Sequence, residues 1–259
     1  MNKEERHKLI LENLISAESI QVAELASLLS VSTVTIRKDL TELENANKLY
    51  RSHGRAILAN PYINNRSVNE KEKLARREKE HIGQYAATLV EPADSIVIAS
   101  GTTVQAFARA IHPQGRLTVI SASLQVSEIL GGNEDVDLFQ LGGTVRHSSL
   151  SVVGKSAETM LADFSCSKLF LGVDGIDLDF GITTTDIREA ELNQAMMRCA
   201  QKTIVLADSS KFRRRGFSKI ANITDVDMVI TDSNVPDTIA RHFEENGIEL
   251  HIVDLPVQP

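Results

Sequence analysis

The N-terminal architecture of this 259-residue chain follows from one run of residues, Val31-Ser32-Thr33-Val34-Thr35-Ile36-Arg37-Lys38-Asp39-Leu40. Ser32 is of a type that caps helices, because its hydroxyl can accept a hydrogen bond from a free N–H of the first helical turn. The run therefore predicts a helix from about residue 33 to residue 45. Its buried face is predicted from apolar residues at helical spacing, namely Ile36, Leu40 and Leu43.

The opposite face of this helix carries short polar side chains and cations. Such a face can enter the major groove of DNA, where polar groups near the helix N-terminus reach base edges and cations meet phosphates. The alternative is the solvated face of a small helical domain. The candidate DNA-binding residues here are Ser32, Thr33, Val34, Thr35, Arg37, Lys38 and Thr41.

Two shorter helices and a hairpin are predicted around it. Apolar residues at helical spacing indicate the helices, namely Leu9, Ile10 and Leu14, then Val22, Leu25, Ala26 and Leu29. Two β-capable runs, Lys48 to Arg51 and Arg55 to Leu58, flank Ser52-His53-Gly54, which is typical of a hairpin turn. Arg51 and Arg55 beside its tip are candidates for phosphate contacts. Residues 1–60 are thus predicted to form a winged helix-turn-helix.

Charge is distributed unevenly along the chain. The net charge is −7 overall, about +2 for residues 1–80 and about −9 for residues 81–259. The N-terminal part of the chain is therefore mildly basic and the rest is acidic. This distribution is compatible with nucleic-acid binding by the N-terminal part. The hydrophobic fraction of 42% and the charged fraction of 24% are those of a soluble globular protein.

Several classes are excluded by what the chain lacks. No apolar run approaches 18 residues and no apolar leader follows the N-terminus, so we expect a cytoplasmic protein that neither spans a membrane nor is secreted. Cys166 and Cys199 have no partners at zinc spacing. We expect two reduced, largely buried thiols and no metal site.

The pattern of charged and apolar residues changes after Asn60-Pro61. Residues 61–78 alternate in charge and are predicted to be a linker. Residues 79–259 alternate apolar strands with helices, which favours a mostly parallel α/β sheet covered on both faces, with a ligand site beyond the carboxyl ends of the strands. The strand cores are 96–99, 117–120, 136–141, 168–173, 203–207, 227–231 and 249–253, and the helices are 79–90, 104–111, 123–130, 154–163, 186–200 and 236–246.

A phosphate site is suggested directly after the first of these strands. Ser100-Gly101-Thr102-Thr103 combines hydroxyls, a glycine that allows close backbone approach, and the start of a helix, whose free N–H groups favour anions. By spacing alone, a capped strand-to-helix turn is the alternative.

The N-terminal run 31–40, together with Leu43 and Gly54, resembles the DeoR family of bacterial transcriptional repressors. The resemblance extends over essentially the whole chain and favours the phosphate-site interpretation of residues 100–103. It implies a second domain similar to ribose-5-phosphate isomerase that binds phosphorylated sugars. The runs 146–151, 172–177 and 181–184 look most like regulators of amino-sugar catabolism, notably the N-acetylgalactosamine type.

Other residues become candidate effector contacts through this resemblance. Ser121 and Ser123 occupy a turn where the family commonly has Thr-Asn-Ser, although both could equally be helix caps. The remaining candidates are Gly142, Gly143 and Arg146 after the third strand, Asp174 and Gly175 after the fourth, and Glu189 and Lys211 further on. Ala99 stands where the family usually has an acidic residue, so no carboxylate role is expected there.

Three functions compete: a sugar-phosphate-responsive repressor, a sugar-phosphate isomerase with an accessory domain, and a protein-binding adaptor. An isomerase needs a positioned carboxylate base and no winged helix-turn-helix. We therefore predict a repressor of a sugar or amino-sugar operon, with no catalytic residue and no cofactor. Its partners would be double-stranded operator DNA, a phosphorylated sugar effector, and further copies of itself in a homodimer or homotetramer.

Overall fold

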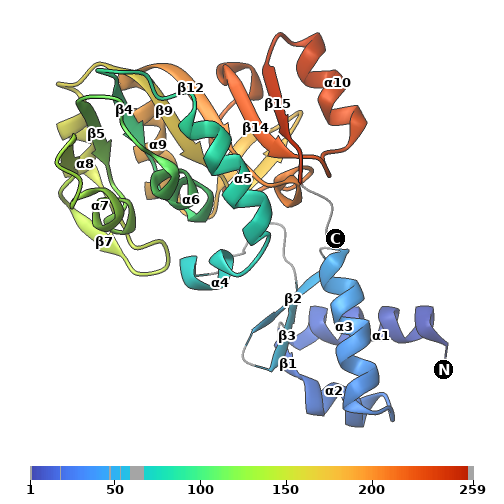
Figure 1. Ribbon diagram of the computed structural model, residues 1–259. Helices are drawn as coiled ribbons and strands as arrows, with labels where there is room; N and C mark the ends of the chain where they lie inside the picture. Colours follow the sequence, from blue (N-terminus) through green and yellow to red (C-terminus); the bar gives the residue numbers. More distant parts are fainter. Residues whose placement is uncertain (1, 18, 47, 53, 59–66, 256–259) are drawn as a thin grey trace. The chain divides into compact units, whose positions relative to one another are not determined.

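A computed structural model describes residues 2–17, 19–46, 48–52, 54–58 and 67–255. The chain divides into two compact units, Met1–Asn64 and Asn65–Pro259, which can be followed by colour in Figure 1. The segment expected to be a linker, residues 61–78, lies outside the described residues up to residue 66. From residue 67 onward it belongs to the second unit and includes helix α4 (Val68–Glu72).

The first unit is a three-helix domain with a small antiparallel sheet. The helices are α1 (Lys3–Ala17), α2 (Val22–Leu28) and α3 (Thr33–Asn45), and the strands are β1 (Ser19–Gln21), β2 (Leu49–Ser52) and β3 (Arg55–Leu58), in the order β1-β3-β2. The predicted hairpin is therefore present, although His53 in its turn lies outside the described residues. Strand β1 was not predicted, because three residues are too few for a detectable alternation.

The core of this unit uses the apolar stripes that the sequence predicted. Ile10, Leu14, Leu25, Ile36 and Leu40 are completely buried. The prediction for Leu9 was wrong, because this side chain is 37% exposed and the stripe of α1 runs through the residues at 10 and 14 instead.

An ion-pair network fixes α3 against α1. The Asp39 carboxylate is almost fully buried and accepts hydrogen bonds from the Arg6 guanidinium and from His7 Nε2, the latter at 3.2 Å. Burial would raise the pKa of Asp39, but the Arg6 hydrogen bond and charge lower it. Asp39 thus orients α3 from its buried side and leaves the opposite face open.

The second unit contains a seven-stranded parallel sheet, which confirms the predicted fold class. All seven expected strands are present: β4 (Ser95–Ile98), β5 (Leu117–Ser121), β6 (Val136–Gln140), β9 (Cys166–Gly172), β12 (Ala200–Leu206), β14 (Met228–Asp232) and β15 (Glu249–Val253). Neighbouring strands pair in parallel throughout.

Helices cover both faces of this sheet (Figure 1). On one face α5 (Arg76–Ala87), α6 (Thr102–Ala110) and α7 (Leu124–Leu130) pack on Ile96, Ile98 and Phe170. On the other face α8 (Lys155–Leu161), α9 (Ile187–Cys199) and α10 (Asp237–Glu245) pack on Val97, Leu169 and Val205. Successive strand residues therefore enter opposite cores, which explains the continuous apolar runs in the sequence.

The strand order creates a crevice in the middle of the sheet. The order is β15-β14-β12-β9-β4-β5-β6. From β4 the chain builds outward through β5 to β6, and it then returns to place β9 on the other side of β4. The connections that leave β4 and β9 consequently diverge, and ligand sites in open α/β sheets lie at such a point, beyond the carboxyl ends of the strands.

Small additional sheets lie near the carboxyl ends of the strands of the large sheet. They are the antiparallel group β10 (Gly175–Asp177), β11 (Gly181–Thr184) and β13 (Ser218–Ala221), and the hairpin β7 (Thr144–Arg146) with β8 (Ser151–Val153). None of them was predicted, because strands of three or four residues carry no clear period. They position Arg146, Asp174 and Thr184 near the diverging connections.

Candidate functional site

The exposed face of α3 carries most of the predicted DNA contacts. Ser32 is the N-cap and accepts a hydrogen bond from the Thr35 N–H at 3.1 Å, and the hydroxyls of Ser32 and Thr35 lie 2.9 Å apart. Thr33, Arg37 and Lys38 are exposed, and Val34 is 71% exposed. An exposed apolar side chain beside cations suits a base methyl group better than it suits water.

Thr41 and Arg51, two of the remaining predicted DNA contacts, have partners within the unit. Thr41 is half-buried and its hydroxyl donates to the Arg37 carbonyl at 2.8 Å. The Arg51 guanidinium pairs with the Glu44 carboxylate at 2.7 Å, so the predicted wing is tied to α3. Arg55 on β3 is half-buried. Thr33, Val34, Arg37 and Lys38 are therefore the more accessible part of the predicted surface.

In the second unit a cavity of about 50 Å³ lies at the diverging ends of β4 and β9. It brings together residues from six separate segments of the chain. Its lining contains eight of the predicted effector residues, Ser100, Gly101, Thr102, Thr103, Arg146, Asp174, Glu189 and Lys211. It also contains residues that were not predicted as effector contacts, namely Val68, Lys71, Ser148, Ser149, Gly172, Val173, Thr184 and Asn193.

Asp174 is the electrostatic centre of this cavity. Its carboxylate accepts a hydrogen bond from Lys71 Nζ at 2.5 Å and from the Thr184 hydroxyl at 3.2 Å. Burial would raise the pKa of Asp174, but the positive charges of Lys71 and Lys211 lower it to about 2. The cavity thus holds an ionised carboxylate between two lysines.

Lys211 supplies a cation that the fold leaves available. It ends the 3-10 turn η1 (Ser209–Lys211) that follows β12. Burial lowers the pKa of Lys211, which the charges of Asp208 and Asp174 partly oppose. Its ammonium group forms no hydrogen bond or ion pair with any side chain among the described residues, and such a donor suits a phosphate oxygen.

Arg146 and Glu189 form a second polar group in the cavity. The Arg146 guanidinium donates to Asp186 at 3.1 Å and to Glu189 at 3.2 Å, and Glu189 also accepts from the Thr184 hydroxyl at 3.1 Å. Because two carboxylates already neutralise Arg146, this group is suited to sugar hydroxyls rather than to a phosphate dianion.

Ser100 and Gly101 lie between β4 and the first turn of α6, as the sequence predicted. Gly101 is the N-cap of α6 and has a φ of +123°, a backbone conformation that residues with a Cβ rarely adopt. A Cβ built on it would meet no atom within 4 Å. The backbone at Gly101 therefore lies open to an incoming group.

Five predicted effector residues lie outside the cavity lining. The Ser121 hydroxyl donates to the Ile98 carbonyl at 2.8 Å, and Ser123 is the N-cap of α7; both are fully buried. Ser123 thus has the capping role that the sequence left open, whereas Ser121 ends β5 and bonds to the neighbouring strand β4. Gly142 is exposed, while a Cβ on Gly143 would meet Val152 and one on Gly175 would meet the Arg214 backbone. The last two glycines thus serve close packing of the chain.

A pH dependence of stability follows from the low pKa of Asp174. The folded value of about 2 lies below the ordinary value of 3.8, so the unfolded chain binds the extra proton as the pH falls. The carboxylate therefore stabilises the fold above pH 4, and this contribution is lost between about pH 4 and pH 2. The free energy of unfolding, measured in urea, should be higher in the wild type than in Asp174→Asn at pH 7. This difference should be smaller by about 1.5 kcal/mol at pH 2.5. An unchanged difference would contradict the assigned ion pairing.

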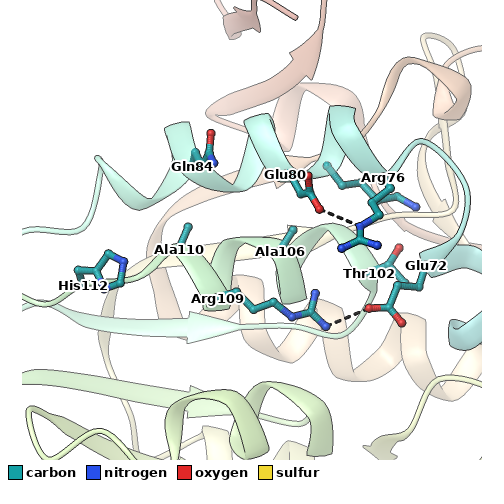
Figure 2. A pocket seen from close by; sticks show the side chains of 10 residues that line it. Glu72, Arg76, Glu80, Gln84, Thr102, Ala106, Arg109, Ala110 and His112 are labelled. Atoms are coloured by element: carbon teal, nitrogen blue, oxygen red, sulfur yellow. Dashed lines mark hydrogen bonds and ion pairs between the residues drawn. The ribbon is translucent and has the colours of Figure 1, made fainter. Parts of the chain in front are cut away.

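A larger cavity, of about 630 Å³, lies between α5 and α6 (Figure 2). Its charged side chains are largely paired with one another. Arg109 donates to Glu72 at 3.0 Å and Arg76 donates to Glu80 at 2.9 Å. Thr102 is the one predicted effector residue in its lining. The volume of a cavity alone therefore does not identify the effector site.

Within the described ranges, no group of three or more His, Cys, Asp or Glu side chains is arranged to hold a metal ion. Cys166 is buried and Cys199 half-buried, both as free thiols. Among the helices that the structure describes, none has the length and apolar character needed to cross a bilayer.

Comparison with protein families gives two matches along the chain. A DeoR-like helix-turn-helix domain matches residues 6–61, and a DeoR C-terminal sensor domain matches residues 74–233. The two matches together cover the exposed face of α3 and most of the residues that line the 50 Å³ cavity.

Several curated proteins are similar over nearly their whole length. A protein named as an aga operon transcriptional repressor of Escherichia coli O157:H7 is 34% identical, with 96% of this chain and 93% of that protein covered. The transcriptional repressor GlcR of Bacillus subtilis (strain 168) is 31% identical, with 98% of each covered. The glycerol-3-phosphate regulon repressor of Escherichia coli (strain K12) is 28% identical, with 97% and 100% covered.

Solved structures resemble the chain more distantly. A sor operon regulator from Shigella flexneri has a TM-score of 0.46 at 11% identity, over 75% of this chain and 95% of that chain. Ribose 5-phosphate isomerase A from Methanocaldococcus jannaschii has a TM-score of 0.38 at 15% identity, over 53% and 55%.

Proposed function

Because the chain belongs to the DeoR family of helix-turn-helix transcriptional regulators, we propose that it represses a sugar or amino-sugar operon and leaves its operator when a phosphorylated sugar binds. The chain is a DNA-binding transcriptional regulator and not an enzyme, as its curated relatives are regulators and repressors. Its location would be the cytoplasm, and its effectors would be phosphorylated sugars.

The observation that carries the effector proposal is the composition of the 50 Å³ cavity. It combines an available half-buried cation at Lys211, the open backbone at Gly101 and the hydroxyls of Ser100 and Thr103, which suit a phosphate group. Asp174 and the group of Arg146 and Glu189 offer partners for sugar hydroxyls. The relative from Escherichia coli O157:H7 is named as an aga operon repressor, and the runs 146–151, 172–177 and 181–184 favour the amino-sugar branch of the family.

The same cavity argues against the isomerase alternative. Removing a proton from carbon needs a positioned base, and it is most efficient when the pKa of that base lies near the working pH. The Asp174 carboxylate has a pKa of about 2, because Lys71 and Lys211 stabilise its ionised form. Glu189 already accepts hydrogen bonds from Arg146 and Thr184. Neither side chain is set up as a strong base.

Repression in this scheme requires two DNA-binding units at a fixed spacing. The proposed regulator is a homodimer or homotetramer, because two helices like α3 must reach successive turns of the major groove. A phosphosugar that binds preferentially to one arrangement of the second unit would change that spacing and lower operator affinity.

We expect the full-length protein to be stabilised by phosphorylated sugars and not by the corresponding free sugars. The effector screen uses aldose and ketose phosphates of five and six carbons, including amino sugars, and measures Tm. A ligand at one hundred times its Kd adds about 2.7 kcal/mol, or roughly 5 °C or more in a domain of this size.

The operator for binding assays is selected by the wild-type protein from a random DNA pool. A phosphosugar that raises Tm should also weaken this complex by about 1 to 3 kcal/mol. If free sugars act as strongly as their phosphates, or if no phosphosugar in the screen alters Tm or operator binding, the proposed effector class is wrong.

A further inference from the structure

Helix α4 forms one wall of the effector cavity and is the element of the second unit that follows the DNA-binding unit most directly in the chain. It contributes Val68 and Lys71 to the lining. With only five residues, it is too short to be stable by itself and depends on its contacts with the rest of the unit.

Those contacts are few and largely polar. The Val68 N–H donates to the Ser148 carbonyl at 2.8 Å, and the Glu72 carboxylate accepts from Arg109 at 3.0 Å. Both partners of the second contact are about half exposed, so this ion pair contributes little stability. Val68 itself is buried, which gives α4 a single apolar anchor.

The C-terminal end of α4 rests on a buried cation. Lys79 Nζ donates to the carbonyls of Lys71 and Leu74 at 2.6 and 2.5 Å, and the side chain of Lys79 lies in α5 with the residue only 4% exposed. Burial lowers the pKa of Lys79 to about 8. The charge that holds the end of α4 therefore carries a desolvation cost of its own.

Lys71 closes the cavity from this wall. Its ammonium lies 2.5 Å from the Asp174 carboxylate, and both side chains are about four-fifths buried. The remaining space of about 50 Å³ is far below the roughly 300 to 1,000 Å³ of small-molecule sites. A phosphosugar can enter only if a wall moves. The other walls are the ends of the central strands, helices α6 and α9, strand β11, the β7–β8 hairpin and the turn η1, and α4 is the shortest α-helix among them.

We propose that Lys71 is a phosphate-binding residue of the effector site and that α4 is the movable wall of this site. The phosphate of an entering phosphosugar replaces Asp174 as the partner of Lys71, and α4 shifts together with Lys71. This inference rests on the proposed function. The carboxylate that Lys71 leaves can accept a hydrogen bond from a sugar hydroxyl, while Lys71 gains the phosphate as its anionic partner. The shift of α4 is the step by which ligand binding reaches the segment leading to the DNA-binding unit.

The test compares Lys71→Ala and Lys71→Met with Lys73→Ala in the full chain. Lys73 is the C-cap of the same helix and is exposed, so its variant makes the same charge change outside the cavity. Lys71→Met keeps the length of the side chain if the alanine variant folds poorly. The ligand is each phosphosugar that stabilises the wild type, and its Kd is measured by calorimetry.

We expect both Lys71 variants to bind the phosphosugar at least tenfold more weakly, and Lys73→Ala to stay within twofold of the wild type. At saturating ligand, the ratio of operator Kd with and without ligand should fall toward one in the Lys71 variants. Amide hydrogen exchange of residues 67–75 should change several-fold on ligand binding in the wild type, whereas α10 should not change.

The outcomes separate this inference from the proposed function. If the wild type responds to phosphosugars but the Lys71 variants bind them as tightly, Lys71 is not a phosphate ligand and the proposed function stands. Unchanged exchange at residues 67–75 on binding would refute the movement of α4. If no phosphosugar affects the wild type, both the proposed function and this inference fall.

Discussion

Replacing Lys211 with alanine is expected to give a repressor that keeps its operator at phosphosugar concentrations that release the wild type. The Lys211 ammonium faces the cavity beside Asp174 and has no hydrogen-bond partner among the described residues. Loss of its hydrogen bond to a charged phosphate should cost about 1.5 to 3 kcal/mol, which is roughly ten- to a hundredfold in effector affinity. Titration of the operator complex with the effector measures this shift.

Operator affinity without effector should stay unchanged in Lys211→Ala, because the DNA-binding unit is untouched. Lys73→Ala removes the same charge from an exposed position and should release its operator normally. Release of Lys211→Ala at wild-type effector concentrations would place the phosphate elsewhere.

Gly101→Val should produce the same phenotype through a different perturbation. The open space next to Gly101 is where the backbone would receive the phosphate, so a side chain there blocks its approach. A valine at a φ of +123° is also strained, and Gly115 provides the control because it has the same φ and equally open surroundings. Gly115→Val should lose stability to a similar extent and still respond to the effector. Equal loss of response in both variants would attribute the phenotype to strain.

The second large effect is expected on the exposed face of α3. Arg37→Ala and Lys38→Ala should each weaken operator binding by about 1 to 3 kcal/mol if the side chain contacts a base edge. A phosphate contact would instead reduce the slope of log Kd against log salt by about one unit. Both side chains are exposed, so neither variant should lower Tm.

Lys8→Ala is the matched control for the α3 variants. Lys8 lies on α1 of the same unit, and its side chain is 78% exposed. Its removal changes the net charge equally and should leave operator affinity within about twofold. If Lys8→Ala weakens binding as much as the α3 variants do, the effect is general electrostatics. If Arg37→Ala and Lys38→Ala retain wild-type affinity and salt slope, α3 does not contact the operator.

The winged helix-turn-helix and the parallel sheet could be predicted because both are local patterns repeated many times. Ile36 and Leu40 are one helical turn apart and both are buried, as the period of 3.6 requires. The continuous apolar strand that contains Val97 and Ile98 faces a core on each side. Capping at Ser32 is likewise local, since its partner is three residues away.

The candidate site was only partly predictable. The loop containing Ser100 and Gly101 lies in the cavity, because a strand end followed by a helix start is visible in the sequence. Ser121 follows a strand in the same way, yet its hydroxyl points to the Ile98 carbonyl and away from the cavity. The direction of a side chain at a strand end depends on the neighbouring strand, which sequence spacing does not show.

By itself the sequence determined the two kinds of fold, the exposed cationic face of α3 and most of the loops at the carboxyl ends of the strands. The tertiary structure alone decided that β9 returns beside β4, which makes their diverging ends a single cavity. It also decided that Lys71, in a segment that reads as a charged linker, pairs with Asp174 more than one hundred residues away. The physical reason is that helical and strand periods are set by local backbone geometry, whereas strand order and ion pairing depend on packing between distant segments.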